Sequence, residues 1–249
     1  MLQTDLNAGI LTLTLNRPDK RNALSSALIE ALHEGVARAD HDPAVRVLVI
    51  KGAGKDFCAG ADLDELLASA DKDPADNEQS ALRLGALFQG LRALPKPVVA
   101  VVQGRALAGG CGLATACDLV LAADTAQFGY PEIQRGFVPA MVMAMLVRQV
   151  GEKRALELTA TGRLLSAAEA QALGLVTEVI RTPDFAPRTS HLVNQLTGVS
   201  LTAYALTKQL CYAQDGLPFD DAIRLGARIN AMSRATPDFR TAISAFLKK

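Results

Sequence analysis

The chain has 249 residues, 49% of them hydrophobic and 21% charged, a balance typical of one large globular domain or a domain with an appendage. Basic and acidic residues both number 26, so the formal net charge is zero, which argues against a nucleic-acid-binding protein. No apolar run reaches the roughly 18 residues of a membrane helix and no secretory leader is visible, so we expect a cytoplasmic protein without membrane segments.

Apolar periodicity predicts strands that alternate with helices along most of the chain. Residues 10–15 alternate leucine with threonine, the pattern of a half-buried strand. Apolar residues after Asn22 recur on one helical face, and Asn22 is the expected cap of that helix. We expect strands at residues 10–15, 45–50, 98–102, 118–122 and 176–180. Alternation of this kind is typical of α/β layer architectures.

The helices between these strands carry their own start signals. Asp62 is expected to cap a helix that starts near Leu63, and Ser166 forms a capping box with Glu169. The polar residues 69–79 predict a mobile surface loop. Further helices are expected at about 80–94, inside the glycine-rich segment before residue 118, and at 139–150.

The last quarter of the chain predicts helix throughout. Helical segments are expected near residues 187–197, 199–213 and 218–248. We therefore expect an α/β core over residues 1–190 and a C-terminal helical region over residues 191–249.

Two glycine-containing loops, at residues 58–62 and 106–111, each follow a strand and precede a helix. Glycine lets a backbone approach a ligand closely, and a helix N-terminus favours an anionic oxygen. The plainer interpretation is a pair of tight turns that allow close helix packing. Glu132 stands alone among Phe128, Tyr130 and Ile133, and a carboxylate in apolar surroundings suits general acid/base chemistry. A structural carboxylate is the alternative.

Several other chemistries lack their motifs. The glycine-rich segments match neither a dinucleotide fingerprint nor a phosphate loop, and no GxSxG elbow is present. The chain has four cysteines without a CxxC pair and three histidines, so we expect no metal site. Reduced thiols are expected.

Three segments resemble the crotonase family of enoyl-CoA hydratases and isomerases: FCAGADL at 57–63, GRALAGGCGLATACDLVLAAD at 104–124 and FGYPEIQRGFVPA at 128–140. NRPDKRNAL at 16–24, TGRLLSAAEAQALGLV at 161–176 and the helical tail are similar too, so the resemblance covers nearly the whole chain. It implies a spiral core of ββα repeats, a C-terminal helical trimerisation region, and a homotrimer or dimer of trimers. The implied substrate is an acyl-CoA thioester, with no separate cofactor because the coenzyme A is part of the substrate.

The resemblance also implies roles for individual residues. The amides of Ala61 and Gly109 would form an oxyanion hole for the thioester carbonyl, where a few kcal/mol per donor is typical, and Glu132 would be the acid/base. The coenzyme A would lie near Arg17, Lys20 and the loop from Ala59 to Ala61. The expected substrate-binding residues are Arg17, Lys20, Ala59, Gly60, Asp62, Gly110, Phe137 and Met141. Of these, Phe137 and Met141 are expected from loop and helix positions, which also place Leu66, Leu67, Leu87 and Val138 in the pocket. The bulky segment Pro139-Ala140-Met141 is expected to remodel that pocket.

The chain departs from its family at one important position. Typical enoyl-CoA hydratases carry a second glutamate directly after the GGC segment, where this chain has Gly112. A carboxylate that some diene isomerases use is absent too, because Ala140 stands there. An enzyme with a single glutamate can shift a double bond, or it can hydrate one more slowly than an enzyme with two. Another crotonase-type reaction (thioester hydrolysis, decarboxylation or C–C cleavage) and a non-catalytic acyl-CoA-binding homologue are the alternatives.

Overall fold

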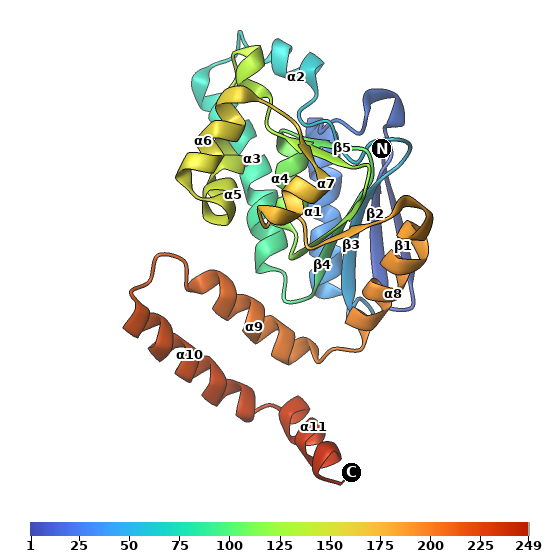
Figure 1. The fold of residues 1–249 in the computed structure, drawn as a ribbon, viewed down its shortest axis with the longest axis vertical. Helices are drawn as coiled ribbons and strands as arrows, with labels where there is room; N and C mark the ends of the chain where they lie inside the picture. Colours follow the sequence, from blue (N-terminus) through green and yellow to red (C-terminus); the bar gives the residue numbers. More distant parts are fainter. Residues whose placement is uncertain (249) are drawn as a thin grey trace.

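The computed structural model describes residues 1–248 and contains a six-stranded sheet with helices packed on both faces (Figure 1). Its order is β1-β2-β3-β4-β6-β9. The first two strands are antiparallel and all other neighbours are parallel. The strands are β1 (Leu2–Asn7), β2 (Ile10–Leu15), β3 (Val47–Gly52), β4 (Val98–Val102), β6 (Leu119–Ala123) and β9 (Glu178–Ile180). The parallel crossovers confirm the predicted α/β architecture.

A second, smaller sheet has the order β5-β7-β8 and adjoins the loops that carry the candidate site. Its strands are β5 (Arg105–Leu107), β7 (Gln127–Gly129) and β8 (Leu165–Ser166). β5 and β7 are parallel, and β8 pairs antiparallel with β7. The sequence did not predict these strands, because two or three residues are too few to show a period.

The core helices divide between the two faces of the large sheet. The larger apolar core includes Leu28 and Leu32 of α1, Leu87 of α3 and Leu113 of α4. On the opposite face, Val193 of α8 packs with the valines of the central strands. The helices are α1 (Ser26–His41), α2 (Leu63–Ala68), α3 (Pro74–Ala93), α4 (Gly109–Ala116), α5 (Ala140–Val150), α6 (Glu152–Thr161), α7 (Ala167–Ala172) and α8 (Phe185–Thr197). Short 3-10 turns are η1 (Pro18–Lys20), η2 (Glu132–Arg135) and η3 (Thr182–Asp184).

Two predicted helix caps are confirmed and one is wrong. Asp62 accepts a hydrogen bond from the amide of Asp64 at the start of α2, and Ser166 forms the predicted capping box. Asn22, however, does not cap α1, since Ser25 accepts the hydrogen bond from the amide of Leu28. The Asn22 side chain is fully buried and instead donates to backbone carbonyls of the loop after β3.

Helix α3 begins six residues earlier than its predicted start at Ser80. The Asp73 side chain accepts from the amide of Ala75, and Pro74 occupies the first helical turn. An aspartate cap followed by proline is a favourable helix start, because proline has no N–H to leave unpaired there. Much of the predicted mobile loop at residues 69–79 is therefore helical.

The last three helices are α9 (Leu201–Ala213), α10 (Phe219–Arg234) and α11 (Pro237–Leu247). α9 contacts the end of α3 through Lys208, and α10 and α11 lie beyond α9 (Figure 1). The predicted single segment at 218–248 is two helices, since Thr236 caps a new helix that starts at Pro237. Among residues 1–248, no helix combines the length and apolar character that crossing a membrane requires. The boundary at residue 190 stays a prediction, and α8 crosses it.

One buried ion pair fastens α9 to the core. Lys208 Nζ lies 2.8 Å from Asp118 Oδ2, and both side chains are less than a tenth exposed. Tyr204 and Tyr212 also donate their hydroxyls to the Asp118 carboxylate. Because a buried charge is costly without partners, this cluster makes the position of α9 strongly dependent on all its members.

Candidate active site

Three loops from distant parts of the chain lie side by side at one end of the small sheet. Cys58 forms a parallel bridge with Ala106, and the amide of Leu107 donates to the carbonyl of Cys58 at 2.9 Å. The amide of Ala108 donates to the carbonyl of Gly129 at 2.8 Å. Since Glu132 follows Gly129 by three residues, these bonds bring the two glycine loops and the carboxylate segment together.

The two glycine loops approach each other too closely for ordinary side chains. A Cβ placed on Gly60 would lie 2.7 Å from the Cβ of Ala108 and 3.5 Å from the amide nitrogen of Gly109. Gly60 also has a φ of +95°, which L side chains rarely adopt. A Cβ on Gly110 would overlap the carbonyl oxygen of Cys58. Glycine at these positions is therefore a packing requirement as well as an opening toward a ligand.

The backbone amides of Ala61 and Gly109 lie at this contact and find no acceptor among residues 1–248. Gly109 is the first residue of α4, where a helix has no internal acceptor for its N–H. Ala108, which precedes it, has a φ of 52° and a ψ of −128°, a conformation that costs a non-glycine residue about 1–3 kcal/mol. The chain thus holds two free N–H groups next to a strained residue.

Glu132 begins η2 and is only 8% exposed. Its Oε2 atom is buried and has no hydrogen-bond partner within residues 1–248. Burial holds the pKa of the Glu132 carboxyl above its ordinary value, against a smaller opposite effect from a backbone hydrogen bond and from Arg135. A carboxyl that retains its proton closer to neutral pH suits proton transfer in both directions.

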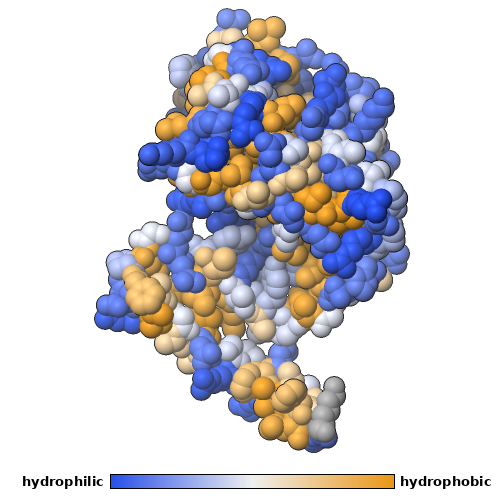
Figure 2. Space-filling model, viewed as in Figure 1, coloured by the Kyte–Doolittle hydropathy of each residue, from blue (hydrophilic) through white to orange (hydrophobic). Residues whose placement is uncertain are grey.

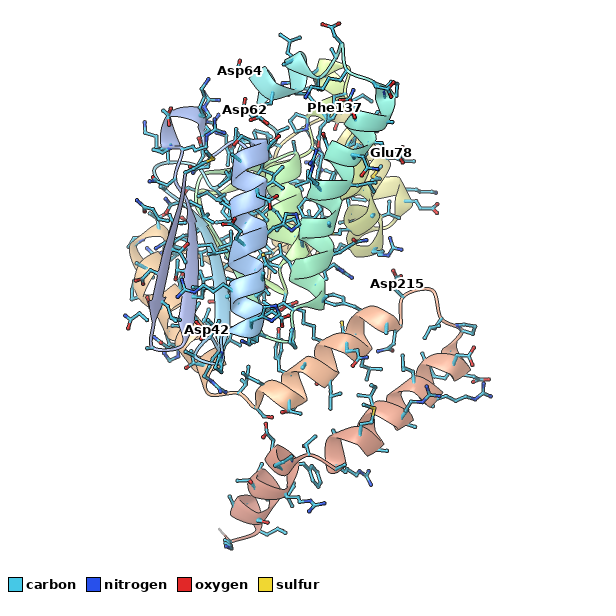
Figure 3. All side chains as sticks on the ribbon, turned by 180° about the vertical axis from the view of Figure 1, so that it is seen from behind. Asp42, Asp62, Asp64, Glu78, Phe137 and Asp215 are labelled. Atoms are coloured by element: carbon cyan, nitrogen blue, oxygen red, sulfur yellow. The ribbon has the colours of Figure 1, made fainter. Side chains whose placement is uncertain are left out.

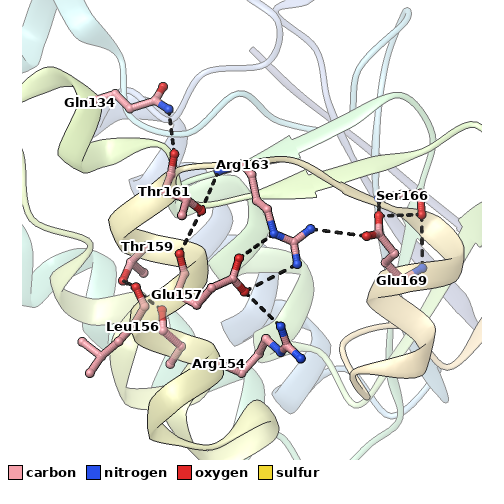
Figure 4. A network of polar contacts seen from close by, with 10 residues as sticks. Gln134, Arg154, Leu156, Glu157, Thr159, Thr161, Arg163, Ser166 and Glu169 are labelled. Carbon is pink, nitrogen blue, oxygen red and sulfur yellow. Dashed lines mark hydrogen bonds and ion pairs between the residues drawn. The ribbon is translucent and has the colours of Figure 1, made fainter.

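A polar network on the far side of η2 anchors this turn (Figure 4). The Gln134 side chain donates to the carbonyl of Thr161 at the end of α6, at 3.0 Å. Arg163, two residues later, donates to Glu157 at 2.6 Å and to Glu169 of the capping box at 3.3 Å. The Gln134 bond fixes the turn that carries Glu132 to the end of α6, and Arg163 links α6 to α7.

The sequence model of the enoyl-CoA hydratase/isomerase family matches residues 5–249. The chain belongs to the enoyl-CoA hydratase/isomerase family.

Individual relatives agree with this assignment over nearly their whole lengths. A putative enoyl-CoA hydratase of Thermus thermophilus is 41% identical over 96% of this chain and 95% of its own. The 2,3-dehydroadipyl-CoA hydratase of Escherichia coli is 35% identical over 96% of this chain and 92% of its own. The crystal structure of an enoyl-CoA hydratase from Mycobacterium smegmatis has a TM-score of 0.94 at 34% identity, covering 99% of this chain and 96% of that one. The fold is therefore the crotonase fold.

Two of the expected coenzyme A contacts are engaged with acidic partners in this member of the family. Arg17 donates to Asp62 at 2.8 Å, and this bond holds the pKa of Asp62 below its ordinary value. Lys20 pairs with Asp64 at 2.9 Å on the exposed surface. Asp62 and Asp64 lie at the same end of the molecule as Phe137 (Figure 3). Direct contact of Arg17, Lys20 and Asp62 with a substrate stays a prediction.

The other predicted binding residues differ in their contacts and in how exposed they are. Ala59 donates its amide to the carbonyl of Arg21, whereas Phe137 donates its amide to the carbonyl of Glu132 and is 41% exposed. Met141 lies against α3, with its Cγ 3.5 Å from a Cβ placed on Gly85. Of the additional pocket residues, Leu87 is completely buried in the core, while Leu67 and Val138 are 77% and 67% exposed.

Sequence reasoning missed Leu84 and Phe88, one helical turn apart on α3. A Cβ on Gly109 would lie 3.7 Å from Leu84 Cδ2, and one on Gly112 would lie 3.1 Å from Phe88 Cζ. These side chains therefore line α4 beside the two free amides. Their spacing of four residues on an expected helix indicates that the two side chains share one face of that helix. Only the packing shows that this face lies against α4.

Two basic residues near the first glycine loop were also missed. Arg21 and Lys55 have no ion-pair partner within the described part of the chain. Asn22, next to Arg21, donates to the carbonyls of Ala53 and Asp56 on either side of Lys55. The two cations thus belong to adjoining segments.

The buried thiols take no visible part in this site. Burial raises the pKa of Cys58 and of Cys111 to about 12, so both stay protonated. Residues 1–248 contain no cluster of three or more histidine, cysteine, aspartate or glutamate side chains that could hold a metal ion.

Proposed function

We propose that the chain transforms enoyl-CoA thioesters by stabilising an enolate, with Glu132 as its acid/base. The observation that supports this proposal is the contact of the loops that hold the amides of Ala61 and Gly109, neither with an acceptor within residues 1–248, with the segment that leads to Glu132. The buried Oε2 atom of Glu132 has no hydrogen-bond partner within the same residues. Deprotonation of C2 places negative charge on the thioester oxygen. Two preorganised N–H donors stabilise that charge in the transition state, where each such donor contributes about 3–4 kcal/mol.

A double-bond shift needs only these groups. Glu132 takes a proton from C2 of a 3-enoyl thioester, and the electron pair delocalises onto the thioester oxygen between the two amides. The protonated Glu132 then returns the proton at C4, so the double bond moves from C3–C4 to C2–C3. In hydration, water attacks C3 of a 2-enoyl thioester, and Glu132 removes its proton and delivers one to C2. Neither reaction needs a separate cofactor, because the coenzyme A is part of the substrate.

Glu132→Gln tests this mechanism directly. The amide does not accept a proton, so turnover of 2-enoyl and 3-enoyl thioesters should fall on the order of 10²–10⁴-fold. Binding of a saturated acyl-CoA should stay close to that of the parent protein. Glu30→Gln, on the exposed face of α1, is the matched control. Unchanged turnover in Glu132→Gln would show that another group moves the proton, and tight thioester binding without any turnover by the parent protein would indicate a non-catalytic homologue.

For the coenzyme A portion, we propose that Arg21 and Lys55 contact its phosphates. Neither forms an ion pair within residues 1–248, whereas Lys20 pairs with Asp64 at 2.9 Å. Arg21 is one of the weaker influences that lower the pKa of Asp56, whose ion-pair partner is Arg105. Arg21→Gln and Lys55→Gln should each weaken acyl-CoA binding and reduce its salt dependence, while Lys20→Gln should do so less. Isothermal titration at two salt concentrations measures both effects. A larger loss for Lys20→Gln than for either other variant would reverse the assignment.

We propose further that the helices α10 and α11 mediate a homotrimer or a dimer of trimers. Exposed apolar side chains support this: Phe219, Ile223, Met232, Ile243, Phe246 and Leu247 are between 44% and 78% exposed. Figure 2 shows apolar residues on this outlying part of the molecule. Large exposed apolar patches mark interaction surfaces in many proteins. Light scattering tests the proposal, and a monomeric mass would overturn it.

A further inference from the structure

The position where the family's second glutamate would stand is filled with hydrocarbon in this chain. A Cβ placed on Gly112 would overlap Cγ1 of Val142 and lie 3.1 and 3.3 Å from two ring carbons of Phe88. Val142 is 3% exposed and Phe88 is 4% exposed. Gly112 therefore does not leave an empty space, because α3 and α5 close over it.

This hydrocarbon surface continues to the free amides. Gly109 and Gly112 lie one turn apart on α4, and Leu84 and Phe88 lie one turn apart on α3 beside them. Leu84 contacts the position of Gly109, and Phe88 contacts that of Gly112. A thioester whose oxygen is held by the amide of Gly109 would thus have an apolar wall along the α4 side of its reacting carbons.

We propose that Val142, supported by Phe88, is a specificity-determining residue that favours a double-bond shift over the addition of water. The inference rests on the proposed function, with Glu132 as the acid/base. Hydration requires a water molecule held against C3, and an ordered water needs two to four polar partners. The Glu132 carboxylate can be one such partner. On the α4 side, the side chains of Val142 and Phe88 offer no polar group. A double-bond shift moves only a proton between C2 and C4 and needs no such water.

The packing also predicts that Gly112→Glu alone will not place a second carboxylate in the site. Val142 branches at Cβ, so its side chain has few alternative rotamers within a helix. The glutamate side chain in Gly112→Glu would therefore collide with Val142. Gly112→Glu/Val142→Ala removes the methyl group that would overlap the new Cβ, and the Phe88 ring at 3.1–3.3 Å is the tight contact that remains.

The test compares turnover of a 2-enoyl-CoA and a 3-enoyl-CoA series in four proteins: the parent, Val142→Ser, Gly112→Glu/Val142→Ala and Val147→Ala. Ultraviolet absorbance follows the conjugated thioester, and product mass distinguishes added water from a bond shift. We expect the ratio of hydration to shift to rise roughly tenfold in Val142→Ser, which offers water one hydroxyl partner. It should rise on the order of 10²-fold in the double variant. Val147→Ala, on the same helix and partly buried, should keep the parent ratio.

Circular dichroism and melting curves identify variants that fold, and Val142→Ser carries the test if the double variant does not. A ratio equal to that of the parent in the folded variants, with both reactions lost in Glu132→Gln, overturns the role of Val142 and leaves Glu132 in place. Activity that survives Glu132→Gln overturns the proposed function, and this inference with it. A parent protein that hydrates more readily than it shifts also overturns the inference.

Discussion

Replacing Glu132 with glutamine should make the protein more stable at pH 8 while removing its activity. Glu132 is 8% exposed, and its Oε2 atom has no hydrogen-bond partner within residues 1–248. An unpaired buried polar group costs about 1–3 kcal/mol, and more when it is charged. Glutamine is uncharged but still needs partners, so we expect a net gain of about 1 kcal/mol. For a domain of this size that corresponds to an increase in Tm of about 2–4 °C.

The gain should depend on pH in a defined direction. Burial raises the pKa of Glu132 in the folded state, whereas the unfolded chain titrates near the ordinary value of about 4.3. The stability that this proton contributes is fully present below about pH 4.3 and is lost as the pH rises through the folded pKa. The stability difference between Glu132→Gln and the parent should therefore be smallest in acid and widen toward pH 8.

Urea unfolding between pH 5 and pH 8 measures this difference, with Glu30→Gln as the control that should match the parent throughout. Activity is measured on the same preparations. A Glu132→Gln protein that is less stable than the parent at pH 8, or more stable by the same amount at every pH, would refute the reasoning. The first result would indicate a satisfied structural carboxylate, and the second would show that folding does not raise the pKa of Glu132.

Three further predictions concern packing, the buried ion pair and the thiols. Gly112→Ala should lower the free energy of unfolding by about 1 kcal/mol, because overpacking against Val142 outweighs the better helix propensity of alanine; urea unfolding should show no such loss in a Val142→Ala background. Lys208→Met should cost about 3 kcal/mol by leaving Asp118 buried without its cation, and a loss below 1 kcal/mol would contradict this. Cys211 is exposed, so a thiol reagent should titrate one cysteine in the native protein and all four after denaturation.

Local signals predicted several elements correctly. The alternating leucines and threonines of residues 10–15 and the valine-rich run at 98–102 match β2 and β4 residue for residue. The caps at Asp62 and Ser166 also form as predicted. These features depend on neighbours within a few residues, so the sequence contains their full cause.

Features that depend on distant partners were not predictable in the same way. Asn22 resembled a helix cap, yet its amide holds the loop after β3, more than thirty residues away. The strands β5 and β7 are too short to show a period, and they exist because they pair with each other. Such contacts form only when distant segments pack, and the neighbouring residues in the sequence show no pattern that predicts them.

In the candidate site, too, some features could be predicted from the sequence and others depend on tertiary packing. By itself, the sequence determined the chemical groups: one carboxylate at Glu132, glycines where the backbone comes close, and no acid at position 112. Tertiary structure decided how these groups are arranged. It brought three separate loops together, buried Glu132 so that its pKa rises, and closed Val142 over Gly112. Burial and long-range contact arise only when the helices and the sheet pack, so the surroundings of this carboxylate could not be predicted from the sequence.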